Sequence, residues 1–560
     1  MQNLDLLEYG LICNFTLTPD QKHNLKKVCE KVNLKNTLFT HDQALNMELA
    51  DKINAQISEY YLSYGLGGAF VRSTHKKAVT LTRLSAIDLG GLQDLLAAQM
   101  TRGLAMKSED IKLLAEIIYA HAKTVDINAV QNNELRVQLL SSYLDTQKSF
   151  ENVPADDLVR LIVHRYTDST LLIKSQSVID VIKEADEAIS PDFLFQNRIK
   201  FAQVFNRYKP IFLALKKSAR SKTAVNLIAR LSKTHHKPIG MPKSRVFIAD
   251  FLTARGYPAD VFDAFSIFDK FRILNTLAVH KAGLDSDVYQ IRNGKLWYQD
   301  KKKVIAPEQI DAIETYVLSS LRRQLTHLQD SNIKLPKHIR YGLPISEKQS
   351  LGKLPFGTVI PTQQFSKTIS VGVYWENKWG AQDLDLSLID LTGQRTGWGD
   401  AASYNRDHIQ YSGDITNAPE GAMEFMTVTK SGGFGLFVNI YSGTEGCGCK
   451  LLIGEKDPKR EHWMDEVFID EKTHLNSRNT ILGFVNPQNE FIIYQGRLGN
   501  GMISSDRNKA VIERTLVRLW TINDLFEKLD ITYDAVRPPS HDLSYDRMSY
   551  EALVSLFETR

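Results

Sequence analysis

The chain has 560 residues, of which 43% are hydrophobic and 24% charged, and its formal net charge is +4. This length exceeds what one hydrophobic core normally supports, so we expect two to four domains of ordinary globular composition. A net charge this small does not by itself indicate a charged binding partner. Any indication of such a partner must come from how the charges are distributed along the chain. Four cysteines, Cys13, Cys29, Cys447 and Cys449, are too few for a disulfide-stapled scaffold and suit a reducing compartment.

The N-terminal segment MQNLDLLEYGLICNF has no basic region followed by an apolar core, so we expect no cleaved secretion signal. No run of the sequence approaches the roughly 20 apolar residues that a membrane span needs. These features predict a cytoplasmic protein without a membrane span.

The first two-thirds of the chain are predicted to be mainly helical. The segments LGGLQDLLAAQM, DIKLLAEIIYAHAK and ELRVQLLSSYL repeat apolar residues at the spacing of an amphipathic helix. We expect residues 1–340 to form a helical region, and a division into two subdomains near residue 150 stays open. One interruption is VYQIRNGKLWYQ (Val288–Gln299), in which Asn293-Gly294 predicts a β-hairpin.

The pattern changes near residues 340–360, where Pro and Gly cluster, and we place the main domain boundary there. Beyond Phe365 the apolar period becomes two, as in KTISVGVYW and GFGLFVNIYSG. Residues 345–535 are therefore predicted to form an antiparallel β-sandwich. The segment TINDLFEKLDI should be a helix that packs on the sandwich edge, and 536–560 should be a tail with a small helix. The predicted fold is thus multidomain α plus β.

Two aspartates in AQDLDLSLID suggest a metal site. Asp383 and Asp385 are two apart, so in a strand they point the same way, while the intervening leucines face the other side. Two such carboxylates repel one another unless a cation or water screens them, and calcium takes six to eight oxygen ligands. Nearby turns offer further oxygens, from Asp400, Asn405, Asp407 and Asp414. The alternative is a solvated strand end and an ordinary turn at Ser412-Gly413-Asp414.

Residues 366–500 resemble the TerD family of tellurium-resistance and stress-response proteins. The resemblance is carried by ISVGVYWENKWGAQDLDLSLIDLTG, by the turn Tyr411-Ser-Gly-Asp414 and by the strand GGFGLFVNIYSG. It implies a calcium-binding β-sandwich with Asp383, Asp385 and Asp414 as ligands and Asp400 as a weaker one. The family's long acidic loop is replaced here by ITNAPEGAMEF, with Glu420 and Glu424 as its acids, so we expect one ion rather than two.

With its helical region, the chain resembles larger bacterial proteins that carry a TerD domain. The resemblance implies a non-enzymatic calcium-binding scaffold of a stress or tellurium-resistance system, with other proteins of that system as partners. No nucleophile and base can be paired in the sequence, which also argues against an enzyme.

A second hypothesis is an RNA-binding or other nucleic-acid-binding protein. Residues Arg198–Arg245 contain thirteen Lys or Arg and no Asp or Glu. A basic helical face of this kind is typical of proteins that bind phosphate groups. The alternative is that an acidic neighbour, such as VIDVIKEADEAISPD, pairs with it. The predicted contact residues are Lys216, Lys217, Arg220, Lys222, Arg230, Lys233, His235, His236 and Lys237.

Two other pairs could bind a soft metal. Adjacent His235 and His236 point to different sides of a helix, so we do not expect them to share an ion. Cys447 and Cys449 could form a redox pair or join a zinc site, but two unpaired thiols in a hairpin are the simpler interpretation.

Overall fold

In a computed structural model of the chain, the described residues are few before Leu89 and nearly continuous from Leu89 to Phe557. Before Leu89 they are 11–13, 18–20, 23–24, 26–27 and 82–84. From there on, the residues left undescribed are 102–103, 105, 122–124, 145–149, 151, 170–172, 174–175, 239–242, 254–256, 284–285, 291–295, 301–304, 330, 362–368, 392–393, 398–404, 407–408, 430–432, 457–463, 489, 499–512, 514–516, 534–538 and 558–560.

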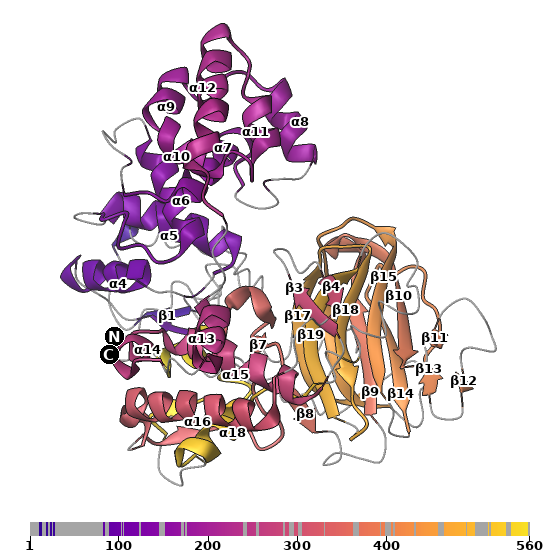
Figure 1. The fold of residues 1–560 in the computed structure, drawn as a ribbon. Coiled ribbons are helices and arrows are strands. Elements are labelled where there is room, and N and C mark those ends of the chain that lie inside the picture. Colours follow the sequence, from indigo (N-terminus) through magenta and orange to yellow (C-terminus); the bar gives the residue numbers. More distant parts are fainter. Residues whose placement is uncertain are drawn as a thin grey trace.

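A first hydrophobic core lies within the helices between Leu89 and His235 (Figure 1). Two of these helices begin at side-chain caps: Asn132 accepts from the backbone N–H of Leu135 at 3.1 Å, and Ser218 accepts from that of Ser221 at 3.2 Å. The helices are α4 (Leu89–Thr101), α5 (Ser108–His121), α6 (Asn133–Tyr143), α7 (Ala155–Thr167), α8 (Gln176–Glu184), α9 (Pro191–Gln196), α10 (Arg198–Val204), α11 (Lys209–Ala214) and α12 (Ala219–His235).

A second group of helices combines residues 243–328 with the C-terminal segment. Helix α18 packs against α16 rather than on the edge of a sheet, which corrects the predicted position of this helix. The reason is that its buried face, with Leu525 and Phe526, belongs to the core that the other helices of the group share. The helices are α13 (Lys243–Leu252), α14 (Ala259–Asp263), α15 (Ile267–Lys281), α16 (Pro307–Gln324), the 3₁₀ turn η3 (Thr326–Leu328), α18 (Ile522–Leu529) and α19 (Tyr550–Ser555).

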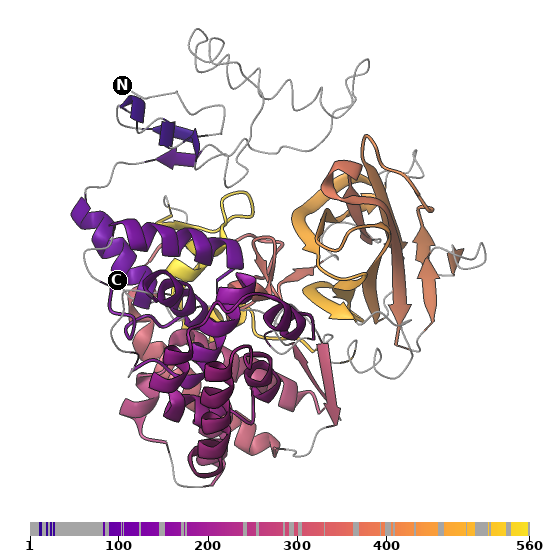
Figure 2. The same cartoon turned by 90° about the horizontal axis from the view of Figure 1, so that it is seen from above.

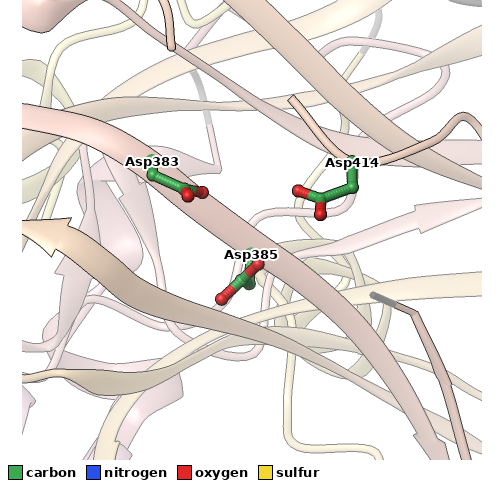
Figure 3. A group of neighbouring side chains, drawn as sticks. All are labelled: Asp383, Asp385 and Asp414. Atoms are coloured by element: carbon green, nitrogen blue, oxygen red, sulfur yellow. The ribbon is translucent and has the colours of Figure 1, made fainter. Parts of the chain in front are cut away.

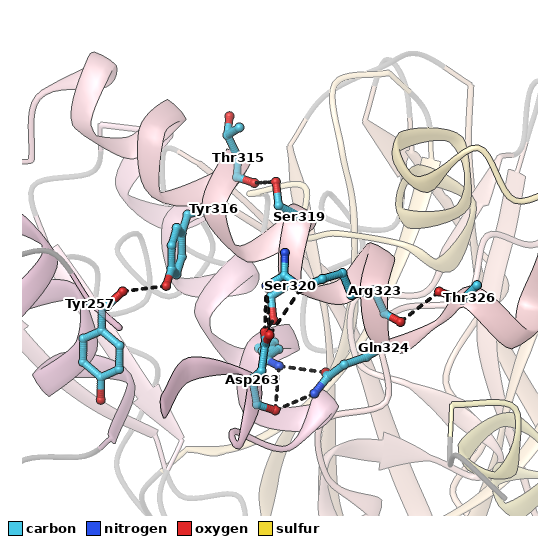
Figure 4. Close-up of polar contacts among 10 residues, drawn as sticks. Tyr257, Asp263, Thr315, Tyr316, Ser319, Ser320, Arg323, Gln324 and Thr326 are labelled. Atoms are coloured by element: carbon cyan, nitrogen blue, oxygen red, sulfur yellow. Dashed lines mark hydrogen bonds and ion pairs between the residues drawn. The ribbon is translucent and has the colours of Figure 1, made fainter. Parts of the chain in front are cut away.

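A polar network joins α14, α15 and α16 inside this second group (Figure 4). Arg323 donates to both carboxylate oxygens of Asp263, at 2.9 and 3.0 Å, and the Ser320 hydroxyl also donates to it. The fully buried Lys270 donates to Oε1 of Gln324 at 2.7 Å. Buried polar groups are therefore used here to fix the packing of three helices.

Small paired segments connect these parts. The predicted hairpin is confirmed as β3 (Ser286–Gln290) paired antiparallel with β4 (Leu296–Asp300). The C-terminal segment returns to the middle of the chain, where Tyr341 donates its hydroxyl to the carbonyl of Leu543 at 2.9 Å. The remaining short elements are β1 (Leu11–Cys13), β2 (Thr82–Leu84), β5 (Ile333–Lys334), η4 (Glu347–Gln349), β6 (Ser350–Leu351), β7 (Leu354–Pro355), η6 (Asn377–Trp379) and β20 (His541–Asp542).

Two antiparallel sheets lie beside the helices (Figures 1 and 2). Apolar side chains of both, such as Val371 and Leu386, belong to one core, and Trp375 donates its indole N–H across to the carbonyl of Gln382 at 3.1 Å. The β10 sheet runs β11 (Arg395–Gly397), β10 (Ala381–Asp390), β15 (Phe434–Gly443), β18 (Asn479–Val485), β19 (Glu490–Leu498) and β8 (Val359–Pro361). The β9 sheet runs β12 (Asn405–Arg406), β13 (Ile409–Tyr411), β14 (Ala422–Val428), β9 (Ile369–Trp375), β16 (Cys447–Lys456) and β17 (Met464–Leu475).

The predicted mixture of a helical N-terminal half and antiparallel strands in the C-terminal half is confirmed. The second hydrophobic core extends from Phe247 through Tyr341 into both sheets, so these sheets share their core with helices on either side of them in sequence. None of the helices that the structure describes is long and apolar enough to span a membrane.

Candidate metal centre

Strand β10 supplies Asp383 and Asp385. In register with β15, Asp383 lies opposite Ser442 and Asp385 opposite Asn439, with irregular pairing on both sides of Asp383. On its other edge, the pairing of β10 with β11 runs from Ser387 to Ile389 within the described residues. The half of β10 that carries the two aspartates therefore borders the end of the sheet, where another segment can approach it.

That segment is the turn after β13. The hydroxyl of Ser412 accepts from the backbone N–H of Phe425 at 2.9 Å, and its own backbone N–H donates to the carbonyl of Phe425 at 2.9 Å. Gly413 follows with φ +109°, which glycine adopts without steric cost. Each residue of the Ser-Gly-Asp sequence thus has a role: Ser412 anchors the turn, Gly413 reverses it and Asp414 carries the carboxylate.

The three aspartates come together between β10 and this turn (Figure 3). One carboxylate oxygen of each lies within 4.8 Å of those of the other two. Asp383 and Asp385 are only 4% and 3% exposed, while Asp414 is exposed. Oδ1 of Asp383 and Oδ2 of Asp385 are buried and have no hydrogen-bond partner among the residues that the structure describes. Buried polar atoms nearly always have a partner, so these two oxygens are candidates for ligands of a cation.

The electrostatics agree with this geometry. Burial, followed by the neighbouring Asp383 and Asp414 carboxylates, raises the pKa of Asp385 to about 7. Burial and Asp414 likewise raise the pKa of Asp383. A hydrogen bond from the Asn439 side chain and, more weakly, the charge of Arg395 on β11 oppose the rise in the pKa of Asp385. The site therefore holds more negative charge than its protein surroundings neutralise, and a divalent cation would remove this imbalance.

The donor set fits a hard cation. It consists of carboxylate oxygens, without sulfur or imidazole, which is the preference of calcium and magnesium rather than zinc. Three side chains leave coordination positions for backbone carbonyls and water, as calcium requires. The predicted ligand Asp400, and Asp407 with it, lies outside the described residues, and of Asn405 only the backbone is described.

The sequence interpretation missed the role of Glu424. This residue of β14 is fully buried, and its carboxylate accepts hydrogen bonds from the Tyr411 hydroxyl, from the backbone N–H of Ile415 at 2.8 Å and from that of Leu386 at 3.1 Å. Burial is the main reason that its pKa rises to about 8. An acid at an inward-facing position of the alternating strand AMEFMTV was the available signal.

Comparison of the chain with models of protein families, with curated proteins and with solved structures finds no match. The resemblance to the TerD family therefore stays a prediction, and the arguments that follow depend on the geometry of this chain.

The predicted basic face is divided into two parts in the structure. In the first part, Lys217 donates to the carbonyls of Lys183 and Ala185, and Arg220 pairs with Asp192. These acceptors belong to the acidic segment 178–192 that the sequence offered as a neighbour. Lys216 is half-buried beside them. Two of the predicted contact residues are thus occupied within the protein.

The second part is a stripe along α12. Lys222, Arg230 and Lys233 are exposed at helical spacing, and none of them forms an ion pair with another described residue. His235, His236 and Lys237 follow at the exposed end of the helix. No metal-binding group that includes either histidine is found among the described residues.

The two thiols of β16 are poor candidates for chemistry. Cys447 and Cys449 are 1% and 0% exposed. Burial raises the pKa of Cys447 to about 11 and also raises that of Cys449, so both are held as neutral thiols. Within the described part of the chain they belong to no cluster of metal-ligating side chains.

A cavity of about 460 Å³ opens between α6, α7 and the junction of α10 and α11. Its charged groups pair with one another: Arg160 contacts Asp157 at 2.5 Å, and Arg207 pairs with Asp156. This mutual neutralisation makes the cavity a weaker candidate than the aspartate cluster.

Proposed function

We propose that this chain is a non-enzymatic protein that binds one calcium ion through Asp383, Asp385 and Asp414. The observation that carries the proposal is the convergence of two buried, unpartnered carboxylate oxygens with a third carboxylate from another segment. Without a cation this arrangement costs free energy, because like charges lie close together in a region of low dielectric constant. With calcium, the same three groups become ligands.

Calcium is favoured over magnesium for a geometric reason. Magnesium requires a nearly ideal octahedron and usually keeps several waters, whereas calcium accepts irregular sets of oxygens. Two ligands fixed on a strand and one on a turn form an irregular set. Buried ligands also leave little room for a hydrated magnesium ion.

Ion binding would cross-link the turn 412–414 to β10 and neutralise the carboxylates at this end of the two sheets. A loop surface whose charge changes with calcium in this way could serve as a docking site, which is the behaviour of a calcium-responsive scaffold. The TerD resemblance supports the further proposals of a cytoplasmic role, of a bacterial stress or tellurium-resistance system, and of other proteins of that system as partners.

The test is calorimetric titration of the full-length chain with calcium, because the sheets share their core with the helices. We expect one site in the unmodified protein and none in Asp383→Asn/Asp385→Asn. The matched control is Glu420→Gln/Glu445→Gln, which removes two exposed acids near the same end of the molecule and should leave binding unchanged. Absence of heat and of any calcium-dependent rise in melting temperature would reject the proposal.

A second candidate function is RNA binding by the stripe on α12. It is favoured by the exposed Lys222, Arg230 and Lys233, which are free to contact phosphates. A short labelled oligouridine should bind with an affinity that falls steeply between roughly 50 and 200 mM salt. Lys222→Gln/Arg230→Gln/Lys233→Gln should weaken binding and flatten this dependence, whereas Lys107→Gln/Lys183→Gln, both outside α12, should do neither. Binding that ignores salt would exclude this function.

A further inference from the structure

Glu424 occupies an unusual position for a buried acid, because its three hydrogen-bond donors come from two separate segments, β10 and the stretch from Tyr411 to Ile415. Oε2 accepts from the backbone N–H of Leu386 and from the Tyr411 hydroxyl, and Oε1 accepts from the backbone N–H of Ile415. The carboxylate is fully buried in the space between the β9 sheet, to which β14 belongs, and the β10 sheet.

Two of these donors are the residues that directly follow metal ligands. Leu386 follows Asp385 on β10, and Ile415 follows Asp414 in the turn. A single rigid side chain therefore holds both ligand-bearing segments, one at each of its oxygens. The distance between the backbones at Asp385 and Asp414 is set by the span of one carboxylate.

We propose that Glu424 is the positioning residue of the calcium site, an inference that rests on the proposed function. It fixes the spacing of the three aspartates before the ion arrives, so that binding does not have to order the turn. Its own oxygens are taken up by the three donors, and it does not belong to the group of side chains that could share an ion. Residues that orient metal ligands in this way typically contribute a factor of roughly 10 to 100 to metal affinity.

The same two sheets contain a matched control. Glu471 on β17 is also buried, accepts the Tyr545 hydroxyl at 2.6 Å and accepts the backbone N–H of Lys353 at 3.2 Å. Its partners hold the C-terminal segment and the stretch after β6, and none of them adjoins an aspartate of the cluster. Glu424→Gln and Glu471→Gln make the same substitution at two buried acids, of which Glu471 also has Lys353 at 3.8 Å, and only the first should affect calcium.

The experiment measures calcium affinity by calorimetry in the full-length protein, together with melting temperature in chelator. Gln has the size of Glu, but its amide group cannot accept both sets of bonds, so one ligand-bearing segment is released. We expect Glu424→Gln to bind calcium roughly 10- to 100-fold more weakly. Glu471→Gln should match the unmodified protein in affinity even where its melting temperature falls.

The outcomes separate the two proposals. If the unmodified protein binds no calcium, the proposed function fails and the positioning role fails with it. If the unmodified protein and Glu424→Gln bind equally well, only the positioning role is overturned. Should Glu424→Gln fail to fold, Tyr411→Phe removes one donor to the same carboxylate. This variant should then weaken affinity several-fold, and an unchanged affinity would overturn the positioning role.

Discussion

Asp383 lies on β10 of one sheet and Asp414 lies in the turn after β13 of the other, yet their carboxylate oxygens approach within 4.8 Å. Neither has an arginine or lysine partner in an ion pair among the described residues. The packing of the two sheets thus forces two negative charges together. This relationship predicts opposite effects of one substitution on stability and on ion binding.

Asp414→Asn should weaken calcium binding by at least tenfold, because it replaces a charged ligand with a neutral one. In chelator the same variant should melt at a higher temperature than the unmodified protein, because the repulsion of Asp383 and Asp385 is relieved. Calorimetry and thermal unfolding measure the two quantities. Glu420→Gln, an exposed acid near the same turn, should change neither. A drop in both affinity and melting temperature would mean that Asp414 is a structural residue instead.

Calcium affinity should depend on pH near neutrality. The pKa of Asp385 is raised to about 7, so below that value a proton must leave before the ion binds. Affinity should therefore fall by up to about tenfold for each pH unit below 7. Without calcium, folding stability depends on pH in the opposite direction to calcium affinity. The charged form of Asp385 is disfavoured in the folded protein, so this group adds stability as pH falls from 7 towards 3.8. The variant Asp385→Asn should not show this rise in stability at lower pH. Calcium titrations and unfolding experiments at several pH values measure the two effects.

The elements of the fold were accessible from sequence because they depend on local patterns. Alternation along β9 and β15, the Asn293-Gly294 hairpin signal and the apolar stripes of the helices each involve neighbours in sequence. The candidate ligands Asp383, Asp385 and Asp414 could also be named, because a strand with period two places the first pair on one side and Ser-Gly-Asp favours a turn. That these segments meet is a result of sheet packing, which no local pattern encodes.

Two features could not be predicted from the sequence, because both depend on contacts between segments that are far apart along the chain. The hydrogen bonds of Glu424 join residues from three segments, so its sequence context shows only an acid in an apolar strand. The division of the basic stretch depends on where α8 and α9 pack: Arg220 meets Asp192, whereas Arg230 is exposed and forms no ion pair with another described residue. A count of charges along the chain predicts both parts of the basic stretch to be free for binding, and it cannot distinguish the paired part from the exposed stripe on α12.

Lys270 should make stability depend on pH in the alkaline range. Burial lowers its pKa from 10.5 to about 8 within the network of Figure 4. Between these values the unfolded chain holds a proton that the folded protein has released, so stability contributed by this group rises with pH. Relative to Lys270→Met, the unfolding free energy of the unmodified protein should rise by about 1.4 kcal/mol per pH unit in this window. Denaturant unfolding at a series of pH values measures this difference, and a difference that stays constant would show that the pKa of Lys270 is not lowered in the folded protein.

Gly413→Ala tests whether the turn must be preorganised for ion binding. At φ +109° an added Cβ strains the backbone by on the order of 1–3 kcal/mol, and the turn should relax away from β10. Since about 1.4 kcal/mol corresponds to a factor of ten, calcium affinity should fall roughly tenfold. The matched control is Gly446→Ala, which has φ +94° in the turn between β15 and β16, open space around its Cβ position and no contact with the cluster. Both variants should lose stability, but only Gly413→Ala should lose affinity. Equal calcium affinity in the two variants would show that the turn reaches its ligand position only after the ion has bound.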